Sequence, residues 1–372
     1  MAALRDPNKL AISPPPSLIE VDQVCQTPTA TSHNANCLQK ASPSDDLSNY
    51  DTTSITASIV DYEYENGRRY HSYRAGSYPL PNDEQELDRI DLKHHIMRLL
   101  CSGHLYIAPL DSPKRILDLG TGTGIWPIEM GEQHPGSEVH GVDLSPVQPN
   151  WVPDNVHLAI DDIEDQNWCW PDNHFDYVHS RFMLCSISNW KRYIRKAFQH
   201  TKPGGYFELQ ELDCRFSSDD GSLREDSAIS YWSDAITEAS ANYNRPIPRY
   251  GEYYDWFVQA GFVDIKQVIL KSPTNPWPKD PKLKEIGRYQ LLAHVEGIEG
   301  VSMGLLTRGS QWKAEEVSVL VAKMKPELKD RAVHSYQTNV VLVGRKPEFP
   351  RTPDSMKDGL SYGWKKGAPG AP

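Results

Sequence analysis

The sequence has few of the features that mark membrane, secreted or metal-binding proteins. No apolar run in its 372 residues approaches the ~20 residues that span a bilayer, and its first residues contain no apolar segment typical of a secretory signal. The six cysteines are scattered and include no C-x-x-C pair, so neither a zinc site nor a disulfide framework is indicated. These absences predict a cytoplasmic or nuclear protein that is not secreted and holds no metal.

The chain is also poor in positive charge. It contains 39 Lys and Arg against 50 Asp and Glu, a formal net charge of -11. Because nucleic-acid backbones are bound by basic surfaces, direct nucleic-acid binding is not expected. No cluster of five or more basic residues marks a nuclear signal, and no internal repeat is visible. A soluble globular domain remains as the expectation.

Composition divides the chain into three parts. Residues 1–57 are rich in Pro, Ser, Thr, Asn and Asp; they would bury too little apolar area to offset the entropy of ordering, which predicts disorder. We expect one domain over residues 58–347, with an N-terminal cap (58–100), a core (101–215), and insertions with the last strands (216–347). Residues 348–372 are expected to form a flexible tail.

The most informative segment begins with an apolar strand from Arg115 to Leu119. It leads directly into Gly120-Thr121-Gly122-Thr123-Gly124, and a helix is predicted from Ile125. Glycines at such a turn allow positive φ and let a ligand approach the backbone closely. A strand, a glycine loop and a helix N-terminus in this order are typical of a nucleotide-binding α/β sheet.

The spacing of this motif discriminates among nucleotide ligands. It reads G-x-G-x-G with Asp118 two residues before it, whereas a dinucleotide fingerprint reads G-x-G-x-x-G and a P-loop ends in Gly-Lys-Ser/Thr. Asp118 is unfavourable beside a pyrophosphate but suits the amino group of a methionine moiety. Asp143, at the end of the next apolar segment, can accept hydrogen bonds from both ribose hydroxyls. S-adenosylmethionine (SAM) is therefore favoured over NAD or ATP.

Further elements follow in an order that suits a mostly parallel sheet. Strands are predicted over 156–160, 175–179, 206–210, 263–270 and 335–344, with a turn at 202–205 and helices over 83–100, 223–241 and 282–296. Alternating strands and helices indicate an α/β fold with helices beside the sheet. The segments 223–250 and 271–312 are then expected as insertions above the carboxyl edge, where ligands bind in such sheets.

Together these segments resemble the class I SAM-dependent methyltransferases, and within them the fungal LaeA-like group. The resemblance covers roughly Tyr64 to Pro347 and is carried by YENGRRYHSYRAGSYPLPNDEQELDRID, LDLGTGTGIWPIE, GVDLSPVQP, FDYVHSRF, KPGGYFELQE and NPWPKD. The group often has Cys at the position of Thr121 and Ala at that of Pro127; neither difference is expected to harm cofactor binding.

The resemblance implies a fold, an activity and a set of cofactor contacts. The fold would be a Rossmann-like, mostly parallel seven-stranded sheet with helices on both faces and helical insertions on the substrate side. The activity would be methyl transfer to a small-molecule or protein acceptor in fungal secondary metabolism, by a tailoring enzyme or a regulator. The alternative is a non-catalytic SAM-binding module that acts through protein partners. The expected cofactor-binding residues are Asp118, Gly120, Thr121, Gly122, Thr123, Gly124, Asp143, Leu144, Asp161, Asp162, Ile163 and, in a lid over the cofactor carboxylate, Tyr70.

The catalytic residues are less visible in the sequence. Methyl transfer is an in-line displacement that mainly requires a nucleophile held at about 3 Å from the methyl carbon, with neither metal nor covalent intermediate. His179, at the end of the fourth strand, is the candidate general base, with a hydrogen-bonded structural histidine as the alternative. Glu208 and Glu211 are lesser candidates on opposite strand faces. Arg181 is expected to anchor an acidic group, because guanidinium stays protonated.

Overall fold

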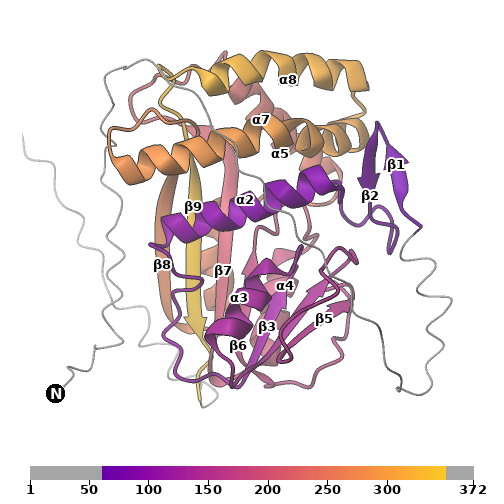
Figure 1. The fold of residues 1–372 in the computed structure, drawn as a ribbon, viewed down its shortest axis with the longest axis vertical. Helices are drawn as coiled ribbons and strands as arrows, with labels where there is room; N and C mark the ends of the chain where they lie inside the picture. Colours follow the sequence, from indigo (N-terminus) through magenta and orange to yellow (C-terminus); the bar gives the residue numbers. More distant parts are fainter. Residues whose placement is uncertain (1–60, 349–372) are drawn as a thin grey trace, which may run out of the picture.

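A computed structural model describes residues 61–348, which form a seven-stranded sheet with helices around it and a small two-stranded hairpin (Figure 1). The expected disorder of residues 1–57 lies outside the described residues, as does the expected tail beyond residue 348. The strands are β1 (Glu63–Glu65), β2 (Arg68–Tyr70), β3 (Arg115–Leu119), β4 (Glu138–Asp143), β5 (Val156–Ile160), β6 (Phe175–Arg181), β7 (Thr201–Ser217), β8 (Val263–Pro273) and β9 (Tyr336–Arg345). The helices are α2 (Glu84–Leu100), α3 (Ile125–Gln133), α4 (Trp190–His200), α5 (Ala228–Asn242), α6 (Tyr250–Ala260), α7 (Pro281–Ser310) and α8 (Ala314–Lys329).

The strand order of the large sheet is β5-β4-β3-β6-β7-β9-β8. Neighbouring strands from β5 to β7 pair in parallel, and β9 is antiparallel to both β7 and β8. The expected mostly parallel, seven-stranded α/β sheet is confirmed. The chain runs outward in opposite directions from β3 and β6, so a ligand crevice is expected at the carboxyl ends of these two strands.

Each face of the sheet is covered by helices and carries its own hydrophobic core. On one face, α4 and α6 pack on the central strands, and the rings of Phe207 and Phe257 stack at a centroid distance of 5.1 Å. On the other face, α2 and α3 contribute Met97 and Trp126 to a second core. This two-sided arrangement confirms the predicted layers and leaves the carboxyl edge open for a site.

A third core lies in a helical cap made by α5, α7 and α8, which lie together at one end of the sheet (Figure 1). Helix α7 begins at the cap residue Asp280, whose side chain accepts a hydrogen bond from Leu283 N at 2.8 Å, and Pro281 fills the first helical position. The helix continues to Ser310, well beyond the predicted range of 282–296. The expected helical insertions are therefore present, and they form a layer of their own.

The predicted turn at residues 202–205 is wrong. These residues form the first part of β7, and the β6–β7 register shifts between Phe175 and Tyr177. Gly204 has φ +81° and donates its N–H to Lys346 O at 2.8 Å. The backbone just after β9 thus pairs with the Pro-Gly-Gly segment and holds it in the sheet as an irregular strand.

Candidate active site

The glycine loop after β3 has the conformation that its sequence predicts. The N–H groups of Gly120 and Thr121 both donate to Val142 O at 2.9 Å, which ties the loop to β4. Gly120 has φ +72°, and a Cβ atom there would lie 2.3 Å from Sδ of Met183. A side chain at position 120 would therefore strain the backbone and collide with the segment that follows β6.

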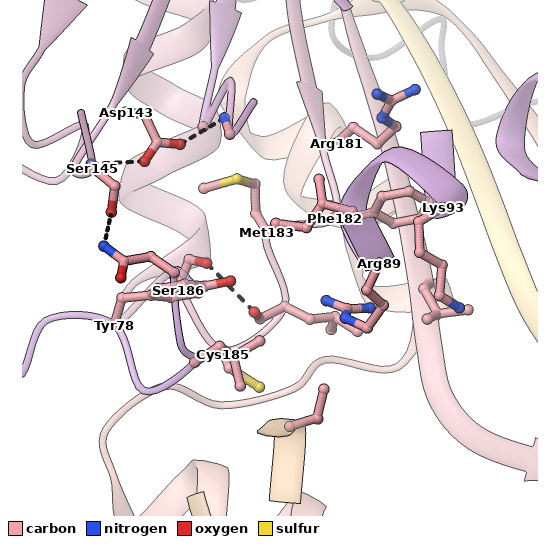
Figure 2. A pocket seen from close by; sticks show the side chains of 18 of the residues that line it. Tyr78, Arg89, Lys93, Asp143, Ser145, Arg181, Phe182, Met183, Cys185 and Ser186 are labelled. Carbon is pink, nitrogen blue, oxygen red and sulfur yellow. Dashed lines mark hydrogen bonds between the residues drawn. The ribbon is translucent and has the colours of Figure 1, made fainter. Parts of the chain in front are cut away.

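A cavity of about 220 Å³ opens where the loops after β3, β4, β5 and β6 meet, as Figure 2 shows from close by. The cavity wall includes nine of the predicted cofactor residues: Asp118, Gly120, Thr121, Gly122, Asp143, Leu144, Asp161, Asp162 and Ile163. These residues come from the carboxyl ends of three strands and the loops that follow them, so the sheet topology, and not sequence proximity, brings them together. The convergence agrees with the crevice expected at the topological switch.

Asp143 is fixed in this wall by two backbone N–H groups. Its Oδ2 accepts a hydrogen bond from Gly122 N at 2.8 Å, and its Oδ1 accepts one from Ser145 N at 2.9 Å. Burial raises the pKa of the Asp143 carboxyl, and the two N–H groups oppose that shift. Each carboxylate oxygen retains a lone pair, so the group can still accept hydrogen bonds from a diol in the cavity.

Two residues of the glycine loop, Thr123 and Gly124, do not line the cavity. Thr123 Oγ1 donates to Asp91 Oδ1 of α2 at 2.6 Å, and Gly124 adopts φ +81° at the start of α3. Both residues stabilise the conformation of the loop on the side away from the cavity. The expectation that they contact the cofactor is not supported by this geometry.

Tyr70 does not form the expected lid. Its side chain is 1% exposed, packs with the guanidinium of Arg308 at 4.5 Å, and is absent from the cavity wall. Antiparallel pairing of β1 and β2 draws the tyrosine under α7, away from the crevice. The segment that covers the cavity comes a few residues later and includes Tyr78 and Asn82, whose Nδ2 donates to Ser145 Oγ at 3.4 Å.

His179 is buried beneath the cavity floor. Its Nδ1 lies 2.7 Å from Asp118 Oδ1, its ring stacks on Trp126 at 3.8 Å, and its side chain has no exposed surface. The residue is not part of the cavity wall. In this geometry His179 does not contact the cavity, and its hydrogen bond to Asp118 favours a role in orienting that carboxylate over general-base catalysis.

The two candidate glutamates of β7 are also structural. Glu208 accepts hydrogen bonds from Ile107 N and Ala108 N, whereas Glu211 accepts one from Met183 N at 2.7 Å on the opposite face. Burial raises the pKa of Glu211 to about 8. Neither residue lines the cavity, so this geometry does not support either as a general base.

The opposite side of the cavity is cationic. Figure 2 shows Arg181, Arg89 and Lys93 on one side and Asp143 on the other. Arg181, at the end of β6, donates to His94 Nδ1 at 2.8 Å, and burial lowers the pKa of its guanidinium. Sequence reasoning predicted an anchoring role for Arg181 but missed Arg89 and Lys93. Their i, i+4 spacing on the predicted helix was the available signal, because it places both on one face.

The strand order and the glycine loop, with Asp143 ending β4 and Asp161 and Asp162 following β5, are those of a class I SAM-dependent methyltransferase. Residues 92–267 match a family model described as a methyltransferase domain. The described residues contain no helix with the length and apolar character that a bilayer crossing requires.

Curated relatives show which family this is. The chain is 42% identical over 298 residues to Methyltransferase pytC of Aspergillus terreus, a match that covers 79% of this chain and 91% of pytC. It is 35% identical over 288 residues to Protein-methionine methyltransferase laeA of Emericella nidulans, with 77% of each chain covered. A Secondary metabolism regulator laeA of Aspergillus niger is 34% identical over 288 residues, covering 77% of this chain and 76% of its own. The chain belongs to this fungal methyltransferase family.

Proposed function

We propose that the cavity binds SAM along the wall formed by β3, β4 and β5, and that the protein methylates a small acceptor held under the helical cap. The observation that carries this proposal is the convergence of nine predicted cofactor residues on one cavity that continues into an apolar chamber. The cofactor supplies a methyl group activated by a sulfonium. The protein has to bind the cofactor and the acceptor, orient them in line, and exclude water.

The residues present fit each part of SAM. Asp118 would accept from the amino group of the methionine moiety, and Asp143 would accept from the ribose hydroxyls. Asp162 and Ile163, after β5, would contact the adenine. Arg181 is the natural partner for the cofactor carboxylate, since the structure gives its guanidinium only the neutral His94 ring as a hydrogen-bond acceptor among the described residues. The amino, carboxylate and ribose hydroxyl groups of the cofactor would thus each meet a complementary side chain.

His179 would act through Asp118. The hydrogen bond from the imidazole fixes one carboxylate oxygen, while Thr121 Oγ1 donates to the other at 2.7 Å. Together the two donors keep Asp118 oriented toward the cavity. We therefore propose His179 as a positioning residue.

The acceptor side of the cavity is largely apolar. Its wall includes Leu80, Trp232, Ile236, Ile247, Ile298 and Val301, which come from the cap and the segments next to it. Such a chamber favours a small molecule with an apolar body, enclosed away from water. We therefore favour a tailoring methyltransferase of fungal secondary metabolism, acting in the cytoplasm or nucleus.

The names of the laeA relatives favour a second candidate, a regulator that methylates a protein acceptor or binds SAM while acting through protein partners. Isothermal titration with SAM tests the cofactor site in either case, and absence of heat at millimolar SAM would refute it. Metabolite comparison between deletion and wild-type strains, with a radiolabelled methyl assay on extracts, separates the two roles. One product changed by a methyl group indicates tailoring, whereas broad loss of products indicates regulation.

A further inference from the structure

Helix α2 contributes to two different regions of the cavity through two adjacent faces. On one face, His94 accepts from Arg181, and Ile90 Cγ2 lies 3.6 Å from the position of a Cβ on Gly122. On the neighbouring face, Arg89 lies against α7, where a Cβ on Gly297 would be 2.0 Å from Arg89 Cδ. Lys93 follows Arg89 by four residues and so extends this second face. The first face contacts the glycine loop and Arg181, and the second faces the cap.

Lys93 is the unpaired cation of this second face. It is 7% exposed, it lines the cavity, and no described residue offers its Nζ a hydrogen bond or an ion pair. The neighbouring Arg89 is already satisfied, because its guanidinium makes a bidentate pair with Glu86 at 2.8 and 2.6 Å. A buried ammonium without an acceptor is unfavourable, and one that lines a cavity is suited to an anionic ligand group.

Lys93 lies among a few polar side chains at one end of the otherwise apolar chamber. His294 of α7 donates from Nε2 to Gln337 Oε1 at 2.9 Å, and its buried Nδ1 has no partner among the described residues. Burial and the nearby Lys93 hold the pKa of His294 well below its usual range, so its ring is neutral. The chamber beyond is lined by apolar side chains such as Ile298 and Trp232.

We propose that the acceptor is an acid with an apolar body, whose ionised oxygen binds Lys93 while its hydrocarbon part fills the chamber under the cap. The inference rests on the proposed function, because it assigns the ligand of the acceptor side. Arg181 remains the partner of the cofactor carboxylate, because β3 and β6 pair so that Asp118 lies opposite His179, two residues before Arg181. Lys93 interacts electrostatically with a different set of groups, namely Glu86, Arg89 and His294. The acidic group is a carboxylate or an enolic or phenolic oxygen, because each of these can lie against an ammonium as an anion.

The test uses two probes of nearly the same shape, naphthylacetate and naphthylacetamide, titrated calorimetrically into the full chain saturated with S-adenosylhomocysteine (SAH). At about pH 6, where the Lys93 amine is protonated, we expect the acid to bind at least about tenfold more tightly than the amide, as a charge-assisted hydrogen bond at a buried site should give. Lys93→Met should abolish this preference, and Lys93→Arg should retain part of it. Lys323→Met, on the exposed side of α8, is the matched control and should behave as the wild type.

The affinity for SAH, measured on the same variants, separates failure of this proposal from failure of the proposed function. If the wild type does not bind SAH, the cofactor site is wrong. If Lys93→Met loses SAH binding, the lysine serves the cofactor and the acceptor assignment is overturned. Equal binding of acid and amide to the wild type, absence of binding by both probes at millimolar concentration, or an unchanged preference in Lys93→Met would also overturn it.

Discussion

The cavity has two halves that are built in different ways. The cofactor half consists of loops directly after parallel strands, and many of its contacts are made by backbone groups, as in the hydrogen bonds from Gly120 and Thr121 to Val142 O. The cap half consists of side chains from α2, α5, α7 and adjoining segments that contain Leu80 and Ile247, all far apart in the sequence. The residues of the cofactor half can therefore be predicted from their local spacing in the sequence, whereas those of the cap half depend on how distant helices pack.

The difference between the two halves predicts that substitutions in the glycine loop cause the largest loss of cofactor affinity. Gly120→Val should weaken SAH binding by about 100-fold or more, because it combines a positive φ with a Cβ placed 2.3 Å from Met183 Sδ. Isothermal titration measures the effect. Gly136→Ala is the control, since a Cβ there meets no atom within 4 Å. Wild-type affinity in Gly120→Val would show that the loop is not the binding site.

Asp143→Ala should cause the next largest loss, about 10- to 100-fold in SAH affinity. The substitution removes the proposed ribose acceptor and also leaves Gly122 N and Ser145 N without their carboxylate partner. Titration with SAH and with free adenine distinguishes the two contributions, because only SAH carries the ribose. A similar loss for both ligands would mean that the variant has disturbed the loop as a whole.

A substitution in the cap should affect the other half selectively. Ile236 is 1% exposed and lines the chamber, so Ile236→Ala should lower the free energy of unfolding by about 2–4 kcal/mol and raise the KM for the acceptor. The affinity for SAH should stay within about twofold. Denaturant unfolding and SAH titration on the same variant check both statements. A large loss of SAH affinity would contradict the separation of the two halves.

His179→Asn tests whether the buried histidine is a base or a positioning residue. We expect SAH affinity to fall by about 3- to 10-fold, because Asp118 loses the donor at 2.7 Å. The pH profile of kcat should keep its shape. Disappearance of an ionisation from that profile, with SAH affinity unchanged, would instead restore His179 as the general base.

The smallest effect concerns pH. Burial, together with the nearby Arg89, lowers the pKa of Lys93 to about 7, against the opposing influence of Glu86. The protonated amine is present below that pKa and is lost above it, while naphthylacetate stays ionised throughout. Its advantage over naphthylacetamide should therefore decline from about pH 6 to about pH 9, with His294 neutral over this range. A preference that grows as the pH rises would exclude an ammonium as the binding group.

The sequence predicted most of the sheet and the cofactor half, and the reasons are local. Asp118 is the last residue but one of β3 and Asp143 is the last of β4, so their place at the carboxyl edge follows from strand direction alone. The failures have tertiary causes. His179 was expected at the substrate edge because it lies near a strand end, but α3 brings Trp126 over its ring. Tyr70 is drawn under α7, and Lys93 becomes a buried cation only because α2 packs against the cap. Apart from the i, i+4 spacing of Arg89 and Lys93, none of these contacts has a signature in the neighbouring residues.

Helix α2 is one rigid element with a ligand region on each of two faces. Ile90 adjoins the glycine loop and His94 accepts a hydrogen bond from Arg181, while Lys93, one residue before His94, lines the acceptor chamber. A bound molecule that displaces this helix would therefore alter the binding site of the other molecule. Thermodynamic linkage then requires the affinities of the two molecules to change by the same factor. Measuring SAH affinity with and without acceptor thus reports how strongly the two halves of the enzyme communicate.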